Sequence, residues 1–144
     1  MNKTPIATLL GIALLLAYGC KSIDSTIQDA AYGYLYSMAN YDIDSAEPYA
    51  DSITQETTIG MARMLLPMVD TNYIKSDTPA TIEIESVDMI DDTTAQVAYH
   101  KKTPIKDFHD TVSVVLHNGR WLVHTPTPVI DAALPQRPSR QRHH

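Results

Sequence analysis

The sequence is poor in cysteine and in long apolar runs. Cys20 is the single cysteine among 144 residues, so the chain cannot form an internal disulfide. The longest apolar run, Ile6 to Leu16, is too short to span a bilayer as a helix, which argues against a transmembrane anchor there. No catalytic, nucleotide-binding or metal-binding sequence motif is recognisable, so we expect no cofactor and no bound metal.

Basic residues are scarce in the body of the chain. The formal net charge is −6, and all 17 acidic residues lie between Asp24 and Asp131. Arginines cluster only near the C-terminal end, as Arg137, Arg140 and Arg142. Nucleic acid is therefore not expected as a partner, because phosphate binding needs a clustered basic surface. Hydrophobic residues make up 44% and charged residues 19%, which is typical of one folded globular domain.

The first twenty residues have the pattern of a bacterial export signal. Lys3 supplies a positive charge before the apolar run. The run ends in Ala17-Tyr18-Gly19-Cys20, which resembles the lipobox of bacterial lipoproteins. The match departs from the usual pattern because Leu16 stands at −4 instead of −3 and the bulky Tyr18 stands at −2.

This resemblance implies an address in the cell envelope. Residues 1–19 would be a lipoprotein signal peptide, Cys20 the lipidated first residue of the mature chain, and residues 20–25 the lipidated cysteine and its tether. Lys21, where many inner-membrane lipoproteins have aspartate, favours the outer membrane. The alternative is an ordinary secretory peptide that leaves Cys20 as a free thiol.

Two long helices are predicted in the first half of the mature chain. Ser25 and Gln28 have capping-box spacing, and apolar residues then recur at three- and four-residue intervals, so a helix should begin there and end near Asn40. A short helix or turn is expected over residues 42–52. A second amphipathic helix is expected over residues 54–69.

Pro67 should kink or end this second helix, because proline lacks the backbone donor. Met61, Met64 and Met68 form a stripe beside its apolar face. We interpret the stripe as core packing, since methionine fills irregular gaps.

After Pro79 the apolar period changes from helical to alternating, which predicts about four antiparallel strands. Asn118-Gly119 is the strongest hairpin signal and favours a two-residue type I′ turn. The turn and the alternation together fix a register. The expected pairs are His117 with Arg120, Leu116 with Trp121, Val114 with Val123, Val97 with Val112, and His100 with His109.

This register turns one apolar face toward the helices. Its members are Ala95, Val97, Tyr99, Val112, Val114, Leu116, Trp121 and Val123. Trp121 is expected to be buried against Leu116. None of these side chains is the carboxylate or imidazole that general acid–base catalysis requires, so we expect no enzymatic activity.

Four strand histidines fall on the outward face by the same register: His100, His109, His117 and His124. Two imidazoles facing each other across a hairpin can share a metal ion, but a zinc site needs a third or fourth ligand, and none is evident in the sequence. We therefore interpret these histidines as solvated and expect no metal site.

The order of helix, short helix, helix and antiparallel hairpins resembles the nuclear-transport-factor-2-like fold. It is similar, more narrowly, to small bacterial lipoproteins of unknown function with a lumazine-binding-like domain. The resemblance is carried by Ala31 to Leu35 with Tyr41-Asp42, by Thr93 to Val97, and by Val112 to Trp121. It implies an α+β domain of N-terminal helices on a curved antiparallel sheet, spanning residues 26–126, and it transfers no catalytic residue.

These features favour a membrane-anchored envelope lipoprotein that binds a small hydrophobic ligand or a protein partner and is not an enzyme. A pocket in the cone between helices and sheet would be bordered by Tyr34, Met64, Tyr99 and Trp121. Two alternatives stay open: an assembly protein with a filled core, and a degenerate isomerase- or dehydratase-like enzyme. A homodimer is also left open, and residues 127–144 are expected to form a polar, arginine-rich disordered tail.

The lipobox generates a first prediction. Replacing the sulfur of Cys20 by oxygen, as Cys20→Ser, removes the atom that carries the lipid, so the variant should leave the membrane fraction while its domain stays folded. Cell fractionation after a high-salt wash measures this. A variant that still sediments with membranes would show that the anchor is not at Cys20.

Overall fold

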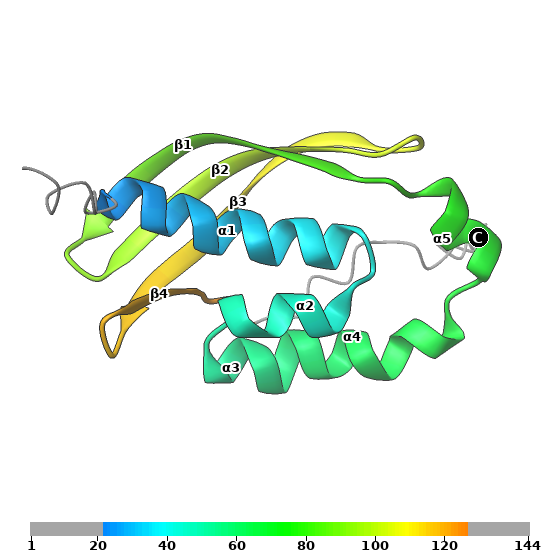
Figure 1. The fold of residues 1–144 in the computed structure, drawn as a ribbon, viewed down its shortest axis with the longest axis horizontal. Helices are drawn as coiled ribbons and strands as arrows, with labels where there is room; N and C mark the ends of the chain where they lie inside the picture. Colours follow the sequence, from blue (N-terminus) through cyan, green and yellow to red (C-terminus); the bar gives the residue numbers. More distant parts are fainter. Residues whose placement is uncertain (1–21, 127–144) are drawn as a thin grey trace, which may run out of the picture.

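The computed structural model describes residues 22–126. Cys20 and the expected signal peptide before it, and the expected tail with Arg137, Arg140 and Arg142, lie outside the described residues. Helices come first and a four-stranded antiparallel sheet follows, so the predicted α+β class is confirmed and the arrangement fits the nuclear-transport-factor-2-like fold. The helices cover one face of a curved sheet (Figure 1). None of the helices in this described stretch has both the length and the apolar character needed to cross a membrane.

Helix α1 (Ile23–Ala39) begins earlier than predicted. Its N-cap is Ser22, whose hydroxyl accepts a hydrogen bond from the amide of Ser25 at 3.2 Å. The expected helix start at Ser25 is therefore wrong. The physical reason is that Ser22 already caps the free amides, so Ser25 belongs to the first turn and donates its own hydroxyl to the Ser22 carbonyl.

The end of α1 is closed by a residue in the left-handed backbone region. Tyr41 has φ +62°, a conformation that a bulky side chain seldom adopts. The amide of Asp42 donates to the Ser37 carbonyl at 2.9 Å and that of Tyr41 to the Met38 carbonyl at 3.2 Å, which is the Schellman pattern. Tyrosine thus occupies the place that glycine usually takes.

Further helical turns form a second layer beside α1. They are α2 (Ile43–Ala46), η1 (Glu47–Tyr49), α3 (Ser52–Thr54), the π-helical η2 (Gln55–Ile59), α4 (Gly60–Leu65) and η3 (Leu66–Met68). The last four are consecutive, so the second long helix runs over residues 52–68, close to the predicted 54–69, and its final turn contains Pro67.

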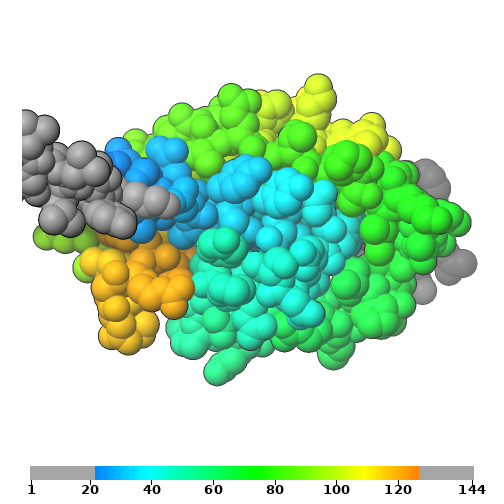
Figure 2. Space-filling model, in the orientation of Figure 1, coloured from blue at the N-terminus to red at the C-terminus, as the bar shows by residue number. Residues whose placement is uncertain are grey.

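Gly33 allows η1 to pack closely on α1. A β-carbon at Gly33 would lie 2.4 Å from the ring of Tyr49, so a side chain there would displace that ring. Figure 2 shows the helices together covering this face of the molecule.

The methionine stripe does not fill the core. Met64 is 66% exposed and Met68 is 79% exposed, because this side of α4 and η3 faces away from the sheet. The interpretation of the stripe as core packing is therefore wrong for these two residues. Ile59, one turn earlier, is fully buried and takes the core position.

A short helix between the second layer and the sheet was not predicted. It is α5 (Thr71–Ser76), capped by Asp70, whose carboxylate accepts a hydrogen bond from the Asn72 amide at 2.6 Å. No residue of this helix is buried, so it lacks the apolar periodicity that reveals amphipathic helices in a sequence.

The sheet has the predicted topology and register. Strands β1 (Thr81–Asp91), β2 (Thr94–Lys102), β3 (Asp107–His117) and β4 (Arg120–Val123) lie in sequence order. All five expected pairs are observed. Asn118 and Gly119 both have positive φ, at +49° and +76°, as the type I′ turn requires.

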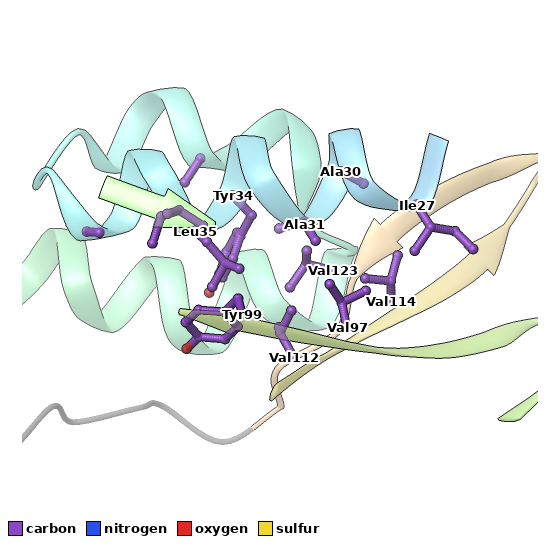
Figure 3. Packing of buried hydrophobic residues seen from close by; sticks show 14 of the residues in the cluster. Ile27, Ala30, Ala31, Tyr34, Leu35, Val97, Tyr99, Val112, Val114 and Val123 are labelled. Atoms are coloured by element: carbon purple, nitrogen blue, oxygen red, sulfur yellow. The ribbon is translucent and has the colours of Figure 1, made fainter. Parts of the chain in front are cut away.

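The core lies between α1 and the sheet, where small and β-branched side chains interlock (Figure 3). Ile27, Val97, Val114 and Val123 are fully buried. Trp121 is only half-buried and packs against the margin of this core, so its predicted burial is corrected. It lies on the short edge strand β4, which has a neighbouring strand on one side only.

Asp77 is a buried carboxylate that ties three parts of the fold together. It is 1% exposed and accepts hydrogen bonds from the hydroxyls of Tyr41 and Thr103, each at 2.7 Å, while the Lys106 ammonium lies 3.3 Å away. Burial alone would raise the pKa of Asp77, but the bonds from Tyr41 and Thr103 and the charge of Lys106 outweigh it, and the pKa lies below its usual value. Asp77 therefore stabilises the fold above the ordinary carboxyl pKa, and this contribution is lost as the pH falls through the lower, folded value.

Replacing Tyr41 by phenylalanine tests this network, because Tyr41→Phe keeps the ring and the helix-closing backbone but removes one donor from a buried charge. The free energy of unfolding in urea should fall by about 1–3 kcal/mol. Tyr32→Phe is the matched control: Tyr32 is exposed and stacks on Tyr36, so its change should stay within about 0.5 kcal/mol. Equal unfolding midpoints for the two variants would mean that Asp77 does not depend on Tyr41.

Candidate functional site

A cavity of about 350 Å³ opens between α1, the second helical layer and the inner face of the sheet. Its volume lies within the range of small-molecule sites in proteins, roughly 300–1,000 Å³. The lining residues come from every layer of the fold: Tyr34, Leu35, Met38, Ala39, Tyr41, Thr58, Leu65, Val69, Tyr73, Ile82, Tyr99, Lys101, Lys106, Phe108, Asp110, Thr111, Val112 and Thr125.

The deep part of the cavity is apolar and aromatic. Tyr34 on α1 and Tyr99 on β2 extend into the space between helix and sheet (Figure 3), and both are buried. Leu35 and Val112 close the wall beside them. Such a surface can bind rings and aliphatic groups through van der Waals contacts. These contacts are not directional, so they do not fix the orientation of a bound group.

Two of the four residues predicted to border the pocket lie on it, and two do not. Tyr34 and Tyr99 line the cavity. Met64 does not, because it points into solvent, and its neighbour Leu65 lines the cavity instead. Trp121 is also absent from the lining, since β4 packs at the opposite end of the cone from the opening. The predicted border is corrected at these two positions.

One corner of the cavity is polar and is built from three hydroxyls. The Tyr34 hydroxyl lies 3.2 Å from Oγ1 of Thr125, which in turn lies 3.2 Å from Oγ1 of Thr58. The Thr58 hydroxyl also donates to the Thr125 carbonyl at 2.6 Å. Burial raises the pKa of Tyr34, so its hydroxyl stays protonated at neutral pH and acts as a hydrogen-bonding group.

The opening of the cavity is charged. Lys101 on β2 and Asp110 on β3 lie on the inward side of the sheet, beyond the buried positions, and Lys106 reaches in from the hairpin between these strands. The Lys101 ammonium lies 5.4 Å from the centre of the Phe108 ring, and that of Lys106 lies 5.5 Å from the Tyr73 ring. The apolar inner face inferred from the sequence thus ends in a polar rim.

Asp77 fixes part of this rim from behind. It does not line the cavity, but the two side chains that it holds, Tyr41 and Lys106, both do. The positive charge of Lys106 is compensated within the protein, so the rim presents Lys101 and Asp110 as a pair of opposite charges.

A second buried carboxylate lies beside the polar corner. Asp51 caps α3 by accepting a hydrogen bond from the Thr54 amide at 2.8 Å, and its other oxygen binds Nδ1 of His124. Burial alone would raise the pKa of Asp51. The hydrogen bonds with Thr54 and His124 outweigh burial, so the pKa of Asp51 lies below that of an ordinary aspartate. The prediction of a solvated His124 is therefore wrong. The Thr54 hydroxyl, which donates to the Val123 carbonyl and accepts from the Thr125 amide, holds the same junction.

The lining of the cavity is rich in rings and hydroxyls and poor in carboxylates. Among the described residues that line it, Asp110 is the one carboxylate and there is no imidazole. Asp110 is exposed at the rim. The deep part is lined by rings, aliphatic groups and hydroxyls.

No protein-family model matches the sequence. No curated protein matches it either. Solved structures that align with the chain include the following two. One is an NTF-2-like protein of unknown function from Shewanella oneidensis, with 16% identity over 69% of this chain and 92% of that one and a TM-score of 0.49. The other, from Campylobacter jejuni, is named as a candidate NTF2-like transpeptidase, with 16% identity over 67% of this chain and 94% of that one and a TM-score of 0.44. At this level of similarity, neither lends a residue role or an activity to this chain.

Proposed function

We propose that this protein is a lipid-anchored module of the bacterial envelope that binds a small, largely apolar, ring-containing molecule in its cavity without transforming it. The observation that carries the proposal is the cavity itself, which remains open between the helices and the sheet although the chain has many side chains large enough to fill it.

The lining explains the class of ligand. Tyr34, Tyr73, Tyr99 and Phe108 offer ring faces and edges, and Met38 adds a polarisable thioether. A flat molecule makes contact with such walls over both of its faces. The Tyr34 hydroxyl, at the polar corner with Thr58 and Thr125, would accept or donate one hydrogen bond and so set the ligand's orientation.

The rim argues for a ligand without net charge. Lys106 is paired with Asp77, and the two other charged side chains of the lining, Lys101 and Asp110, have opposite signs, so the charges near the entrance balance. A molecule with a strong charge of either sign gains little there and loses its hydration in the apolar interior.

The absence of an enzymatic role is part of the proposal. A reaction that moves a proton needs a group of tuned pKa within reach of the substrate, and the deep lining offers only neutral hydroxyls. The envelope address depends on the lipobox at Cys20, and a tether there would hold a binding module close to ligands that partition into membranes.

An assembly role is the second candidate, and a specific observation favours it. Met64 and Met68 are exposed on one helical face beside Leu65, and large exposed apolar side chains of this kind mark contact surfaces. On this view the cavity would be incidental and a protein partner would cover α4 and η3.

A pair of adjacent substitutions separates these roles. Leu65 lines the cavity and is partly exposed, so Leu65→Trp should fill space at the opening without disturbing the core, whereas Met64→Trp adds the same ring to the solvent side. The probe is the neutral fluorophore N-phenyl-1-naphthylamine, titrated into the purified chain. We expect Leu65→Trp to weaken binding about tenfold, equivalent to roughly 1.4 kcal/mol, and Met64→Trp to leave it unchanged.

Binding that is absent in the parent chain, or lost equally in both variants, would contradict the pocket proposal. Loss in Met64→Trp alone would place the apolar contact on the outer helical face and favour the assembly role. Unfolding midpoints of both variants show that any loss of binding is not a loss of fold.

A further inference from the structure

We infer that His100, Asp107 and His109 form a binding site for a divalent transition-metal ion, Zn²⁺ being the best match, on the outer face of the sheet. This site is separate from the cavity and does not depend on the proposed ligand. The sequence showed two facing histidines without a third ligand, and the structure supplies the third from the strand that carries one of them.

The strand register brings the three side chains together. His100 on β2 pairs with His109 on β3, and Asp107 lies two residues before His109, so both β3 side chains are on the same face. That face is turned away from α1, because the alternate residues Tyr99 and Val97 are buried between the sheet and the helix (Figure 3). Asp107 therefore lies diagonally across from His100, and its carboxylate oxygen is 2.6 Å from Nε2 of His100.

The separation of the donor atoms suits one ion. Each of the three residues offers a ligand atom within 4.8 Å of the other two. In a tetrahedral zinc site, bonds of about 2.0–2.2 Å place neighbouring ligand atoms roughly 3.3 Å apart. The imidazole rings are stacked, with centres 4.2 Å apart and planes at 10°, so both nitrogens are near one ion, and the rings must tilt about their side-chain bonds to aim both lone pairs at it.

A neighbouring carboxylate prepares one of the ligands. Nδ1 of His109 lies 2.6 Å from Oε1 of Glu85, which is on β1. When His109 donates its Nδ1 proton to Glu85, the lone pair is on Nε2, on the other side of the ring. Carboxylates hold zinc-binding histidines in this way, and they fix both the tautomer and the direction of the ring.

The donor set selects the class of metal. Two imidazoles and one carboxylate suit Zn²⁺, Ni²⁺ or Cu²⁺, whereas Mg²⁺ and Ca²⁺ prefer sites made only of oxygen. On binding at Nε2, the ion takes the place of the hydrogen between His100 and Asp107, and the neutral imidazole of His100 then carries its single ring proton on Nδ1. With three protein ligands, a zinc ion keeps a fourth position for water or for an outside group. Glu83, which pairs with His100 across β1 and β2, adds negative charge, and Lys102, opposite Asp107, opposes it.

The test measures zinc affinity by competition with a chromophoric indicator. The chain from residue 20 onward, which contains every described residue, is used with Cys20→Ser, His143→Ala and His144→Ala, so that the thiol and the terminal histidines contribute no ligands. We expect one Zn²⁺ per chain, a rise in the thermal unfolding midpoint on adding zinc, and no competition from excess Mg²⁺.

Substitutions then assign the ligands. His109→Asn and Asp107→Asn should each weaken zinc binding at least about tenfold, and Glu85→Gln, which acts through His109, should weaken it by about 10- to 100-fold. His117→Asn is the matched control, because His117 is exposed on the same strand and the same face but lies outside the cluster. Its zinc affinity should equal that of the parent.

Two experiments can overturn the site. In the first, zinc titration, either of two results would do so: a parent chain that binds no zinc, or a His100→Asn/His109→Asn double variant that binds it as tightly as the parent. The second needs no variant: imidazole nitrogen resonances of the parent are recorded by NMR during zinc addition. Those of His100 and His109 should shift while that of His117 stays in place, and unchanged resonances of the first two would exclude them as ligands.

Discussion

The buried carboxylate of Asp77 holds together parts of the chain that local structure alone would leave apart. Tyr41 follows α1, Asp77 ends α5, and Thr103 and Lys106 belong to the β2–β3 hairpin. A charge with 1% exposure is tolerated only when donors surround it, so these segments must meet for the fold to form. The same meeting point determines how the cavity opens, since Tyr41 and Lys106 are part of its lining.

The sheet was predictable because its rules are local. A one-residue slip would turn Val97, Val112 and Val114 into solvent, and Asn118-Gly119 favours a single turn geometry, so the alternation and the turn together leave one register. Helix boundaries were less predictable. Ser22 and Ser25 are equally good N-cap residues in the sequence. Only the structure shows that the Ser25 amide donates to the Ser22 hydroxyl, which makes Ser22 the N-cap. Helix α5 carries no apolar periodicity at all.

The lining of the cavity was predictable only in part, because periodicity identifies the inward side of an element but not the extent of the core. Tyr34 and Tyr99 follow from helical and strand periodicity, which says which side of an element faces inward. Periodicity does not say how far along an element the core extends, so it missed Lys101 and Asp110, which face inward at the open end of the sheet. It also misassigned Met64, which lies on the face beside the apolar one: Ala62 and Leu66 of the apolar face pack against the core, whereas Met64 is exposed.

The unequal lengths of the last two strands have a consequence for how copies of the molecule meet. Within the described residues, β4 covers β3 only from Val114 to His117, so the first half of β3 forms an open sheet edge. Backbone groups along an open edge invite a strand from another molecule. Here Asp107 and Asp110 place like charges along that edge, and the Thr111 amide donates to the carboxylate of Asp110 at 2.8 Å. A second copy pairing in parallel and in register at this edge would bring each carboxylate beside its counterpart, and the repulsion between like charges would weaken that pairing.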